Sequence, residues 1–477
     1  MQVLPRRELL KLFAGLGLTP ALLTLGCRAV IDRWDMAGLI RSRIRTPRIP
    51  ANDFPITDFN AVGDGQTDCS AAIADAIAAA SAAGGGRVIV PKGVFLTGPI
   101  HLESHIELHI EKEATLSFIP EPDRYLPAVF TRWEGVELMG LSPLIYAFGK
   151  TDIAITGQGT LDGGADDTHW WSWKGPWKGK FGDAELTQKA ARDQLFADAE
   201  SGVPPEQRHF AEGAYLRPPF IQAYHCEYVL IEGVTIIRSP FWLIHPVLST
   251  SVTVRGVTCQ SKGPNSDGCD PESCKNVLIE DCVFDTGDDC IAIKSGRNAD
   301  GRRVAVPSEN IIVSNCEMRA GHGGIVMGSE LSGGIKNVFM ENCRMSSPDL
   351  DRGVRIKTNA MRGGGVENLN VRNIEIGNVG DLLVINFFYE EGENGPYAPL
   401  VSDIDIRDVH CENATRVMDT RGFDHARIRD LKLTNVHVKT VTEPSRISHV
   451  EGLVLDNVFV NGKLVNSRDD LLVVNNE

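Results

Sequence analysis

The stretch Asn265–Gly296, NSDGCDPESCKNVLIEDCVFDTGDDCIAIKSG, contains both the repeat and the polar groups around which this chain is organised. Its segment Val277–Cys282, VLIEDC, shows the apolar alternation of a short strand. Asp267 precedes this strand and the pair Asp288–Asp289 follows it, about 21 residues after Asp267. This spacing predicts two neighbouring turns of a coil, each with acidic side chains at a similar position.

A unit of the form apolar, any, apolar, any, Asn/Asp/Gly, apolar recurs along most of the chain. From Val229 onward successive units begin roughly 22 to 35 residues apart, and no long helical pattern intervenes. One such unit cannot bury its apolar face alone, so repeats of this period stack in parallel into a solenoid. A leucine-rich repeat is the competing architecture, but its Leu-x-x-Leu-x-Leu pattern is missing. We therefore predict an all-β fold, a right-handed parallel β-helix. The units begin at Ile106, Ile153, Val229, Val252, Val277, Ile311, Val338, Leu369, Ile404, Leu431 and Leu453.

Residues 51–477 are expected to form this β-helix as a single domain with two additions. An Ala-rich helix is predicted over Ala71–Ala83, with Asp68 or Ser70 as its N-cap and Gly84–Gly86 at its end. An excursion from the coil stack is expected at about 166–217. It contains four tryptophans between residues 170 and 177, and we expect a loop followed by a surface helix.

Residues 1–27 are predicted to be an export signal. Arg6-Arg7 is a twin-arginine pattern, and the apolar run Leu12–Gly26 is about 15 residues long, which is short for a membrane span. Leu25-Gly26-Cys27 resembles a lipoprotein cleavage site, so lipidation of Cys27 is left open. Residues 28–50 are polar and basic and are predicted to be a linker. We expect an exported bacterial protein that is either periplasmic or anchored to a membrane through a lipidated Cys27.

The bulk composition narrows the class of partner. A net charge of −15 argues against nucleic acid and anionic membrane surfaces, so a site for an anionic ligand must be locally basic. Cys282, Cys316 and Cys343 each end a similar strand pattern, which favours a ladder of buried free thiols. Disulfides in an exported protein are the open alternative. The sequence has no CxxC spacing that would indicate a metal site. We expect no cofactor, and we expect the protein to be a monomer.

Polar clusters fall at a similar place in successive repeats. In a parallel stack neighbouring coils lie about 4.8 Å apart, so side chains at the same phase should converge on one face. Asp267 lies about 15 residues after Val252, Asp288 and Asp289 about 11 and 12 after Val277, His322 about 11 after Ile311, and Arg355 and Lys357 about 17 and 19 after Val338.

Three carboxylates, one histidine and two cations on one face suit the hydrolysis of a glycosidic bond in an acidic polysaccharide. Such hydrolysis needs one protonated carboxyl as acid and one ionised carboxylate that activates water or attacks. Crowded carboxylates hold a proton with a raised pKa, which a neighbouring histidine can share. Arg355 and Lys357 are two residues apart on a strand, so both point to one face and can hold a substrate carboxylate. Each motif alone is more often a solvated turn or strand.

These motifs resemble glycoside hydrolase family 28, the polygalacturonases, and the resemblance covers nearly all of the chain after residue 51. They are NSD at 265–267, GDD at 287–289, GHG at 321–323 and RIK at 355–357. Ser266 replaces the threonine of the family's Asn-Thr-Asp but keeps the hydroxyl. The resemblance implies an inverting hydrolase on a right-handed parallel β-helix, with an N-terminal helix that covers the end of the coil stack.

The resemblance also implies roles for individual residues. Asp288 would be the general acid, Asp267 and Asp289 would activate the water, and His322 would support the protonation of the acid. Arg355 and Lys357 would hold the uronate carboxylate beside the scissile bond, and Tyr389 would line the site. His245, within SPFWLIHP at 239–246, either borders the site or packs in the interior. The family needs no metal for catalysis.

The sequence around the motifs resembles a bacterial, exo-polygalacturonase-like branch of the family. This resemblance implies release of galacturonate from the chain ends of pectin. The excursion tryptophans either stack on sugar faces or fix the loop to the coil stack. A hydrolase of rhamnogalacturonan or another decorated pectin is the nearest alternative. A calcium-dependent pectate lyase and a non-catalytic glycan-binding β-helix are alternatives of other classes.

Overall fold

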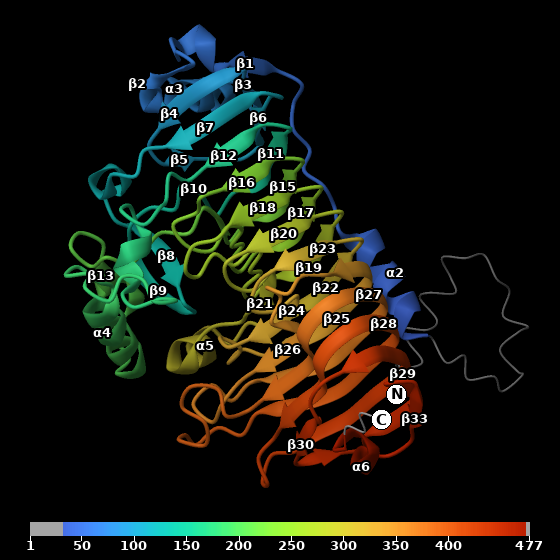
Figure 1. The fold of residues 1–477 in the computed structure, drawn as a ribbon. Helices are drawn as coiled ribbons and strands as arrows, with labels where there is room; N and C mark the ends of the chain where they lie inside the picture. The colour runs from blue at the N-terminus through green and yellow to red at the C-terminus, as the bar shows by residue number, and fades with distance from the viewer. Residues whose placement is uncertain (1–31, 474–477) are drawn as a thin grey trace, which may run out of the picture. The chain divides into compact units, whose positions relative to one another are not determined.

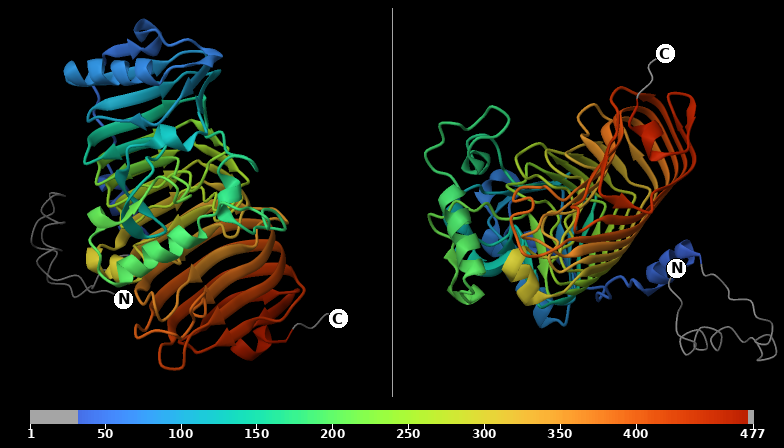
Figure 2. Two further views of the ribbon diagram at one scale, coloured as in Figure 1. Left: turned by 90° about the vertical axis from the view of Figure 1, so that its left-hand side faces the viewer. Right: turned by 90° about the horizontal axis from the view of Figure 1, so that it is seen from below.

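The computed structural model describes residues 32–473. The predicted export signal and Cys27 therefore lie outside the described residues. The chain divides into two compact units, Met1–Met36 and Ala37–Glu477, and the second contains all the strands. It is a stack of coils in which each turn contributes strands to parallel sheets (Figures 1 and 2).

The first sheet runs through the whole stack. Its strands pair in parallel from one coil to the next. They are β3 (Gly86–Val90), β6 (Ile106–Ile110), β11 (Thr151–Gly157), β15 (Glu227–Glu232), β17 (Thr250–Arg255), β19 (Lys275–Glu280), β22 (Ser308–Ser314), β25 (Ile335–Met345), β27 (Gly365–Asn386), β28 (Leu400–Arg421), β29 (Ile428–Val441) and β32 (Val454–Val460).

Two further sheets complete each coil, and the long strands β25, β27 and β28 bend from one sheet into another. The second sheet contains β4 (Gly93–Thr97), β7 (Ala114–Phe118), β12 (Thr160–Asp162), β16 (Thr235–Ile237), β18 (Thr258–Ser261), β20 (Val283–Thr286) and β23 (Glu317–Ala320). The third sheet contains β5 (Ile100–His101), β10 (Ile145–Phe148), β14 (Ile221–Tyr224), β21 (Ile291–Ile293), β24 (Ile325–Gly328), β26 (Arg352–Lys357) and β30 (Arg446–Ser448), with single bridges at 244–247 and 269–272.

The register confirms the repeat and the predicted parallel β-helix. Val229, Val252 and Val277 are directly paired, and the same column continues through the later unit starts to Leu431. These side chains point inward and are almost fully buried. Burial of each one stabilises the fold by about 1.5–3 kcal/mol, which explains why the apolar positions fix the register. A parallel strand connection of this kind is right-handed.

The Asn/Asp/Gly position of the repeat is a corner between the first and second sheets. Gly256, Asp281 and Asn315 occupy it on successive coils with φ of 60°, 57° and 54°. This left-handed conformation costs most other residues roughly 1–2 kcal/mol, and Gly, Asn and Asp tolerate it best. The side chains at such corners also bond between coils: Asn373 Nδ2 donates to Asn342 Oδ1 at 3.1 Å.

The ten cysteines of the described part of the chain are free and buried. Cys282, Cys316 and Cys343 form consecutive hydrogen-bonded rungs, as the strand pattern predicts. The contact with Cys316, together with burial, raises the pKa of the Cys282 thiol well above its ordinary value. The ladder is therefore a packing feature made of neutral thiols.

Both ends of the stack are covered. At the first coil, α3 (Ser70–Ala82) packs against β3 and β1 (Asp53–Pro55), beside β2 (Asp64–Asp68) and a 3₁₀ turn at Ile56–Phe59. The helix lies one residue earlier than predicted, and its N-cap is Cys69, although Asp68 Oδ1 accepts the Ser70 N–H at 2.9 Å. At the last coil, β33 (Lys463–Val465) pairs antiparallel with β32, accompanied by β31 (Val450–Glu451) and α6 (Arg468–Leu471).

Segments that leave the stack gather beside β21, β24 and β26 (Figure 1). The antiparallel pair β8 (Val129–Trp133) and β9 (Val136–Gly140) is joined by β13 (His209–Phe210). The predicted excursion contains a loop with a 3₁₀ turn at Trp171–Lys174 and then α4 (Lys189–Glu200), which packs on α5 (Asn298–Val304). Further 3₁₀ turns lie at Pro122–Tyr125 and Pro205–Gln207.

The predicted linker at 28–50 contains a helix, α2 (Arg33–Arg43), in its described part. Arg41 from this helix donates to Glu280 Oε2 at 2.5 Å and to Ser314 Oγ at 2.8 Å, on strands β19 and β22. This part of the segment is therefore ordered by polar contacts, whereas the domain boundary at residue 51 stays a prediction. Among the described helices, none is both long and apolar enough to cross a membrane.

Candidate active site

The third sheet aligns outward-facing side chains from successive coils in two columns. Alternate residues of a strand face the same side, so register alone decides which side chains share a column. The Arg355 column contains Gln222, His245, Asp270, Ala292, Val326 and Arg355. The Lys357 column contains Tyr224, Val247, Glu272, Lys294, Gly328 and Lys357.

Three aspartates meet beside these columns. One carboxylate oxygen each of Asp267, Asp288 and Asp289 lies within 4.8 Å of the other two. Asp267 and Asp289 are buried, whereas Asp288 keeps 17% of its side chain exposed. The predicted convergence of the two acidic clusters is thus present in the structure, with Asp288 as the member that solvent reaches.

Asp288 is paired with His322. His322 Nδ1 lies 2.9 Å from Asp288 Oδ1, and the His322 side chain is 32% exposed. Burial raises the pKa of Asp288, but the hydrogen bond and charge of His322 outweigh it, so that the pKa lies below its ordinary range. The same contact raises the pKa of His322. The pair therefore shares one proton that resides mainly on the histidine.

Glycine on either side of His322 makes this pairing possible. A Cβ at Gly321 would lie 2.4 Å from the Asp288 carbonyl oxygen, and one at Gly323 would lie 2.5 Å from Val326 Cγ2. The close approach also lets the His322 N–H donate to the Asp288 carbonyl at 3.2 Å. The GHG motif is thus required by backbone packing as well as by chemistry.

Asp289 is paired with the two cations of the RIK motif. Lys357 Nζ donates to Asp289 Oδ2 at 2.7 Å, and an Arg355 guanidinium nitrogen lies 3.5 Å from Oδ1. Both cations also face the Tyr389 ring, with Lys357 Nζ 5.4 Å and the Arg355 guanidinium 5.7 Å from its centroid. Tyr389, predicted to line the site, therefore lies beside the cations.

Asp267 differs from Asp288 in its electrostatic surroundings. Burial, together with the nearby carboxylates of Asp270 and Asp288, raises the pKa of Asp267 well above its ordinary value. Lys294 Nζ opposes this shift from 3.9 Å. Asp267 Oδ1 is buried and accepts no hydrogen bond from the described residues. Burial thus favours the protonated form of Asp267, whereas the contact with His322 favours the ionised form of Asp288.

Three site residues escaped the sequence analysis: Lys294, Glu330 and Asp270. Lys294 Nζ donates to Glu330 Oε2 at 3.2 Å and lies 4.4 Å from the Trp242 ring centre. Asp270 is fully buried, and burial is the largest cause that raises its pKa. The phase of the repeat could have revealed Lys294, because IAIK at 291–294 has the same pattern as VRIK at 354–357. No comparable signal marks Glu330 or Asp270.

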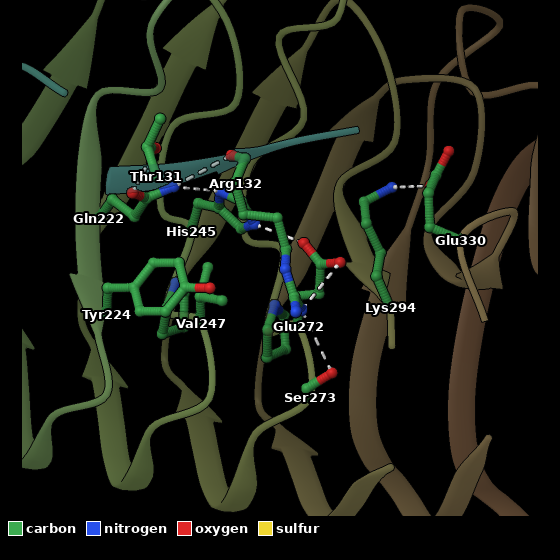
Figure 3. A network of polar contacts seen from close by, with 12 residues as sticks. Thr131, Arg132, Gln222, Tyr224, His245, Val247, Glu272, Ser273, Lys294 and Glu330 are labelled. Carbon is green, nitrogen blue, oxygen red and sulfur yellow. Dashed lines mark hydrogen bonds and ion pairs between the residues drawn. The ribbon is translucent and has the colours of Figure 1, made fainter. Parts of the chain in front are cut away.

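Of the two expected roles of His245, the structure supports packing, because the side chain is fully buried and has no access to a substrate. His245 Nε2 lies 2.9 Å from Glu272 Oε2, and Nδ1 lies 3.1 Å from Gln222 Nε2 (Figure 3). Arg132, from β8, lies 3.3 Å from Glu272. Both ring nitrogens are therefore used by protein groups, and the packing alternative is the one that the structure supports.

Asp267, Asp288 and Asp289 together form the triad. It is also the one group in residues 32–473 whose spacing could hold a metal ion. Its three carboxylates are nevertheless matched by side-chain cations: His322 beside Asp288, Lys357 beside Asp289, and Lys294 near Asp267. A metal ion would have to compete with these cations for the same oxygens. The expectation that catalysis needs no metal stays a prediction.

Comparison of the sequence with known proteins supports the resemblance that the four motifs indicate. The sequence model of the Glycosyl hydrolases family 28 matches residues 207–462, which is more than half of the chain and includes all four motifs. The chain belongs to this family. A second model, described as rhamnogalacturonase A/epimerase, pectate lyase-like, matches residues 54–109 in the first coils. The resemblance predicted from the motifs is confirmed.

A solved structure and two curated proteins extend the match. The exopolygalacturonase of Thermotoga maritima is 44% identical, with a TM-score of 0.87 over 90% of this chain and 96% of that one. A probable polygalacturonase of Vitis vinifera is 27% identical over 84% of this chain and 78% of its own length. The exo-poly-alpha-D-galacturonosidase of Dickeya chrysanthemi is 28% identical over 78% of this chain, which spans 63% of that protein.

Proposed function

We propose that this family 28 enzyme hydrolyses α-1,4-linked galacturonate in pectin or polygalacturonan, acting from chain ends and inverting the anomeric centre. The observation that carries this proposal is the cluster of three aspartates on one face of the coil stack, with one histidine paired to Asp288 and two cations paired to Asp289. The relatives named as exo-acting polygalacturonases support the substrate class and the exo mode.

Asp288 is the general acid in this proposal, and His322 supplies its proton. In the protein without substrate their contact lowers the pKa of Asp288 and raises that of His322, which favours an ion pair with the proton on His322. When charge develops on the leaving oxygen, the proton moves along the 2.9 Å contact to Asp288 and from there to the oxygen. Asp288 is suited to this transfer because it is the most exposed of the three aspartates.

Asp289 is the base that activates water. Lys357 and Arg355 offset its negative charge, and its Oδ1 accepts no hydrogen bond from the described residues. Asp267, whose pKa burial raises, donates a hydrogen bond that orients the water while it is protonated, and accepts a proton only after ionisation. Asp289 thus has a larger share in the water activation that the family resemblance gives to both residues.

Arg355 and Lys357 also bind the galacturonate carboxylate beside the scissile bond. Arg355 approaches Asp289 only to 3.5 Å and keeps 13% of its side chain exposed, so it has donors left for an anion. Tyr389 packs beside both cations and provides a face for the sugar ring. These contacts give the locally basic patch that an anionic substrate of a protein with net charge −15 requires.

The decisive experiment is a time course of purified enzyme on polygalacturonate and on defined galacturonate oligomers. We expect galacturonate monomer from the first time point and no intermediate oligomers, which establishes exo-action. Proton NMR of the first product should show the β anomer, as inversion requires. Release of mixed oligomers would reject the exo mode, and a retained α anomer would reject inversion.

The metal-compatible spacing of the aspartates favours one second candidate, calcium-dependent elimination. A lyase forms an unsaturated product that absorbs in the ultraviolet, whereas a hydrolase does not. Absorbance during the same time course therefore separates the two reactions. A rhamnogalacturonan substrate is separated by including rhamnogalacturonan oligomers in the panel.

We further propose that the enzyme acts after export, on pectic fragments outside the cytoplasm. The twin-arginine pattern at Arg6-Arg7 supports export. Lipidation of Cys27 and the monomeric state stay predictions, and mass spectrometry of the mature N-terminus and sedimentation would test them.

A further inference from the structure

The loop that carries the tryptophan cluster is fixed to the coils that hold the acidic motifs. Trp171 Nε1 donates to the Ser239 carbonyl at 2.9 Å, and its ring lies so close to Gly263 that a Cβ there would meet it at 2.2 Å. Gly263 in turn packs on Gly287, the residue before Asp288, where a Cβ would lie 2.3 Å from the Gly263 carbonyl. The tryptophan loop thus reaches the GDD motif through two glycines.

A second route joins the same loop to the NSD motif. The Gln188 N–H donates to the Trp173 carbonyl at 2.7 Å, and Gln188 Oε1 accepts two bonds from Arg217 at 3.2 Å. Arg217 also donates to Asn265 Oδ1 at 2.7 Å. The turn that ends at Lys174 is therefore positioned against both catalytic motifs.

Lys174 is a half-buried cation with no ion pair or hydrogen bond of its side chain to the described residues. Its electrostatic neighbours are Glu134, Arg217, Arg192 and Asp288, and burial lowers its pKa. Glu134 is already paired with Arg192 at 2.7 Å. Among the described residues Arg217 donates to uncharged acceptors, so neither cation forms an ion pair there, and both interact electrostatically with Asp288.

The contacts that hold the tryptophan loop and the strand of the RIK cations lie on opposite sides of the triad along the coil axis. The tryptophan loop contacts Ser239 and Gly263, which precede the triad, whereas Arg355 lies on β26, after the coil of His322. Lys174 interacts electrostatically with Asp288, more weakly than with Glu134, whereas Lys357 Nζ donates directly to Asp289 Oδ2 at 2.7 Å. Two anionic sugars that span the triad would therefore meet one cationic group each.

We propose that Lys174 binds the carboxylate of a second galacturonate, across the scissile bond from the one that Arg355 and Lys357 hold. This inference rests on the proposed function, because it presumes a polymer of uronic acids. It makes the excursion at 166–217 a specificity element that recognises two consecutive acidic sugars. The tryptophans hold the loop, and the lysine makes the contact.

The test compares wild type, Lys174→Met, Lys174→Arg and Lys178→Met on trigalacturonate. Lys178 is a matched control because it is an exposed lysine of the same loop, over the Trp177 ring at 5.1 Å. We expect Lys174→Met to raise KM about tenfold with kcat within twofold, Lys174→Arg to restore most of the affinity, and Lys178→Met to match wild type. Sodium chloride should raise KM less steeply for Lys174→Met than for wild type, since one charge contact is gone.

The outcomes separate the two proposals. If wild type does not hydrolyse trigalacturonate, the proposed function fails first. If wild type is active and Lys174→Met has the KM and the salt dependence of wild type, the role of Lys174 is wrong. A fall in kcat and melting temperature without a change in KM would show a structural role and would equally overturn the inference.

Discussion

Two regions of the third sheet share the same register but have opposite properties. In the region before the triad, Gln222, His245 and Glu272 lie under β8 and bond to one another and to Arg132. In the region after the triad, Arg355 and Lys357 face Asp289 and the Tyr389 ring, and the Arg355 side chain is partly exposed. The same two columns run through both regions.

The two histidines show what this difference means. Burial lowers the pKa of His245, although Glu272 opposes the shift, while Asp288 raises the pKa of His322. Burial thus favours the neutral form of His245 in a sealed network, and Asp288 favours the charged form of the more accessible His322. Register decides which side chains face outward, and the covering segment decides whether they can react.

The largest expected effect belongs to the solvent-exposed region at and after the triad, called the open region below. Asp288→Asn removes the only group that we place as acid, and we expect kcat on trigalacturonate to fall about 10³–10⁴-fold while binding and melting temperature stay near wild type. Asp285→Asn is the matched control, a nearby aspartate paired with Lys262 instead of the triad. Appreciable activity of purified Asp288→Asn would reject the acid role.

A substitution in the buried region before the triad should change the stability of the fold instead of the reaction rate. Glu272→Gln leaves the buried Arg132 charge with Glu137 alone, so we expect the free energy of unfolding to fall by about 3–5 kcal/mol, measured by denaturant titration. The kcat of the folded variant should stay within twofold of wild type. A large loss of kcat at unchanged stability would mean that the two regions are not functionally separate.

Lys357→Ala also tests the open region, and its expected effect is smaller than that of Asp288→Asn. We expect KM for trigalacturonate to rise at least tenfold, since the substrate carboxylate loses a charged donor. Lys336→Ala is the control, because Lys336 is an exposed lysine on β25 that pairs with Glu367. An unchanged KM in Lys357→Ala would count against carboxylate recognition by the RIK motif.

The pH dependence should differ between the two histidines. The raised pKa of His322 means that its pair with Asp288 contributes stability and activity below the ordinary value of 6.5, which are lost as pH rises through the folded-state value. The lowered pKa of His245 works in the other sense, so its contribution to stability is lost as pH falls below 6.5. His322→Gln should flatten the alkaline side of the rate profile, and His245→Gln the acid side of the melting-temperature profile. Unchanged profiles would reject these assignments.

The smallest expected effect is that of a chelator. Because side-chain cations already contact the aspartates, EDTA should leave the rate of galacturonate release unchanged. Inhibition that calcium reverses would favour the lyase reaction.

The fold was predictable because one pattern determines it at every coil. Inward valines and isoleucines and a corner Asn, Asp or Gly recur at fixed offsets within each unit, so each repeat confirms the others. The motif residues were predictable for the same reason, since phase converts to position in a parallel stack. Tyr389 was found only through the family resemblance.

What could not be predicted depends on segments outside the repeat. His245 and Asp270 share a column with Arg355, but His245 is fully buried in a network that includes Arg132 of β8 and the Trp242 ring. The pairing of Lys294 with Glu330 joins side chains 36 residues apart, and nothing in either local sequence marks it. Covering segments and long-range ion pairs have no period from which they could be inferred.

The buried thiols can report the order in which parts of this protein unfold. Burial raises the pKa of Cys274 to about 12, and the thiolate is the form that reacts with alkylating reagents. A folded coil therefore protects its own sulfur, and an opened coil exposes it. Since cysteines occur on many of the coils from residue 226 to residue 411, the order in which they become labelled under mild denaturant would show whether the stack frays from its ends or melts as one body.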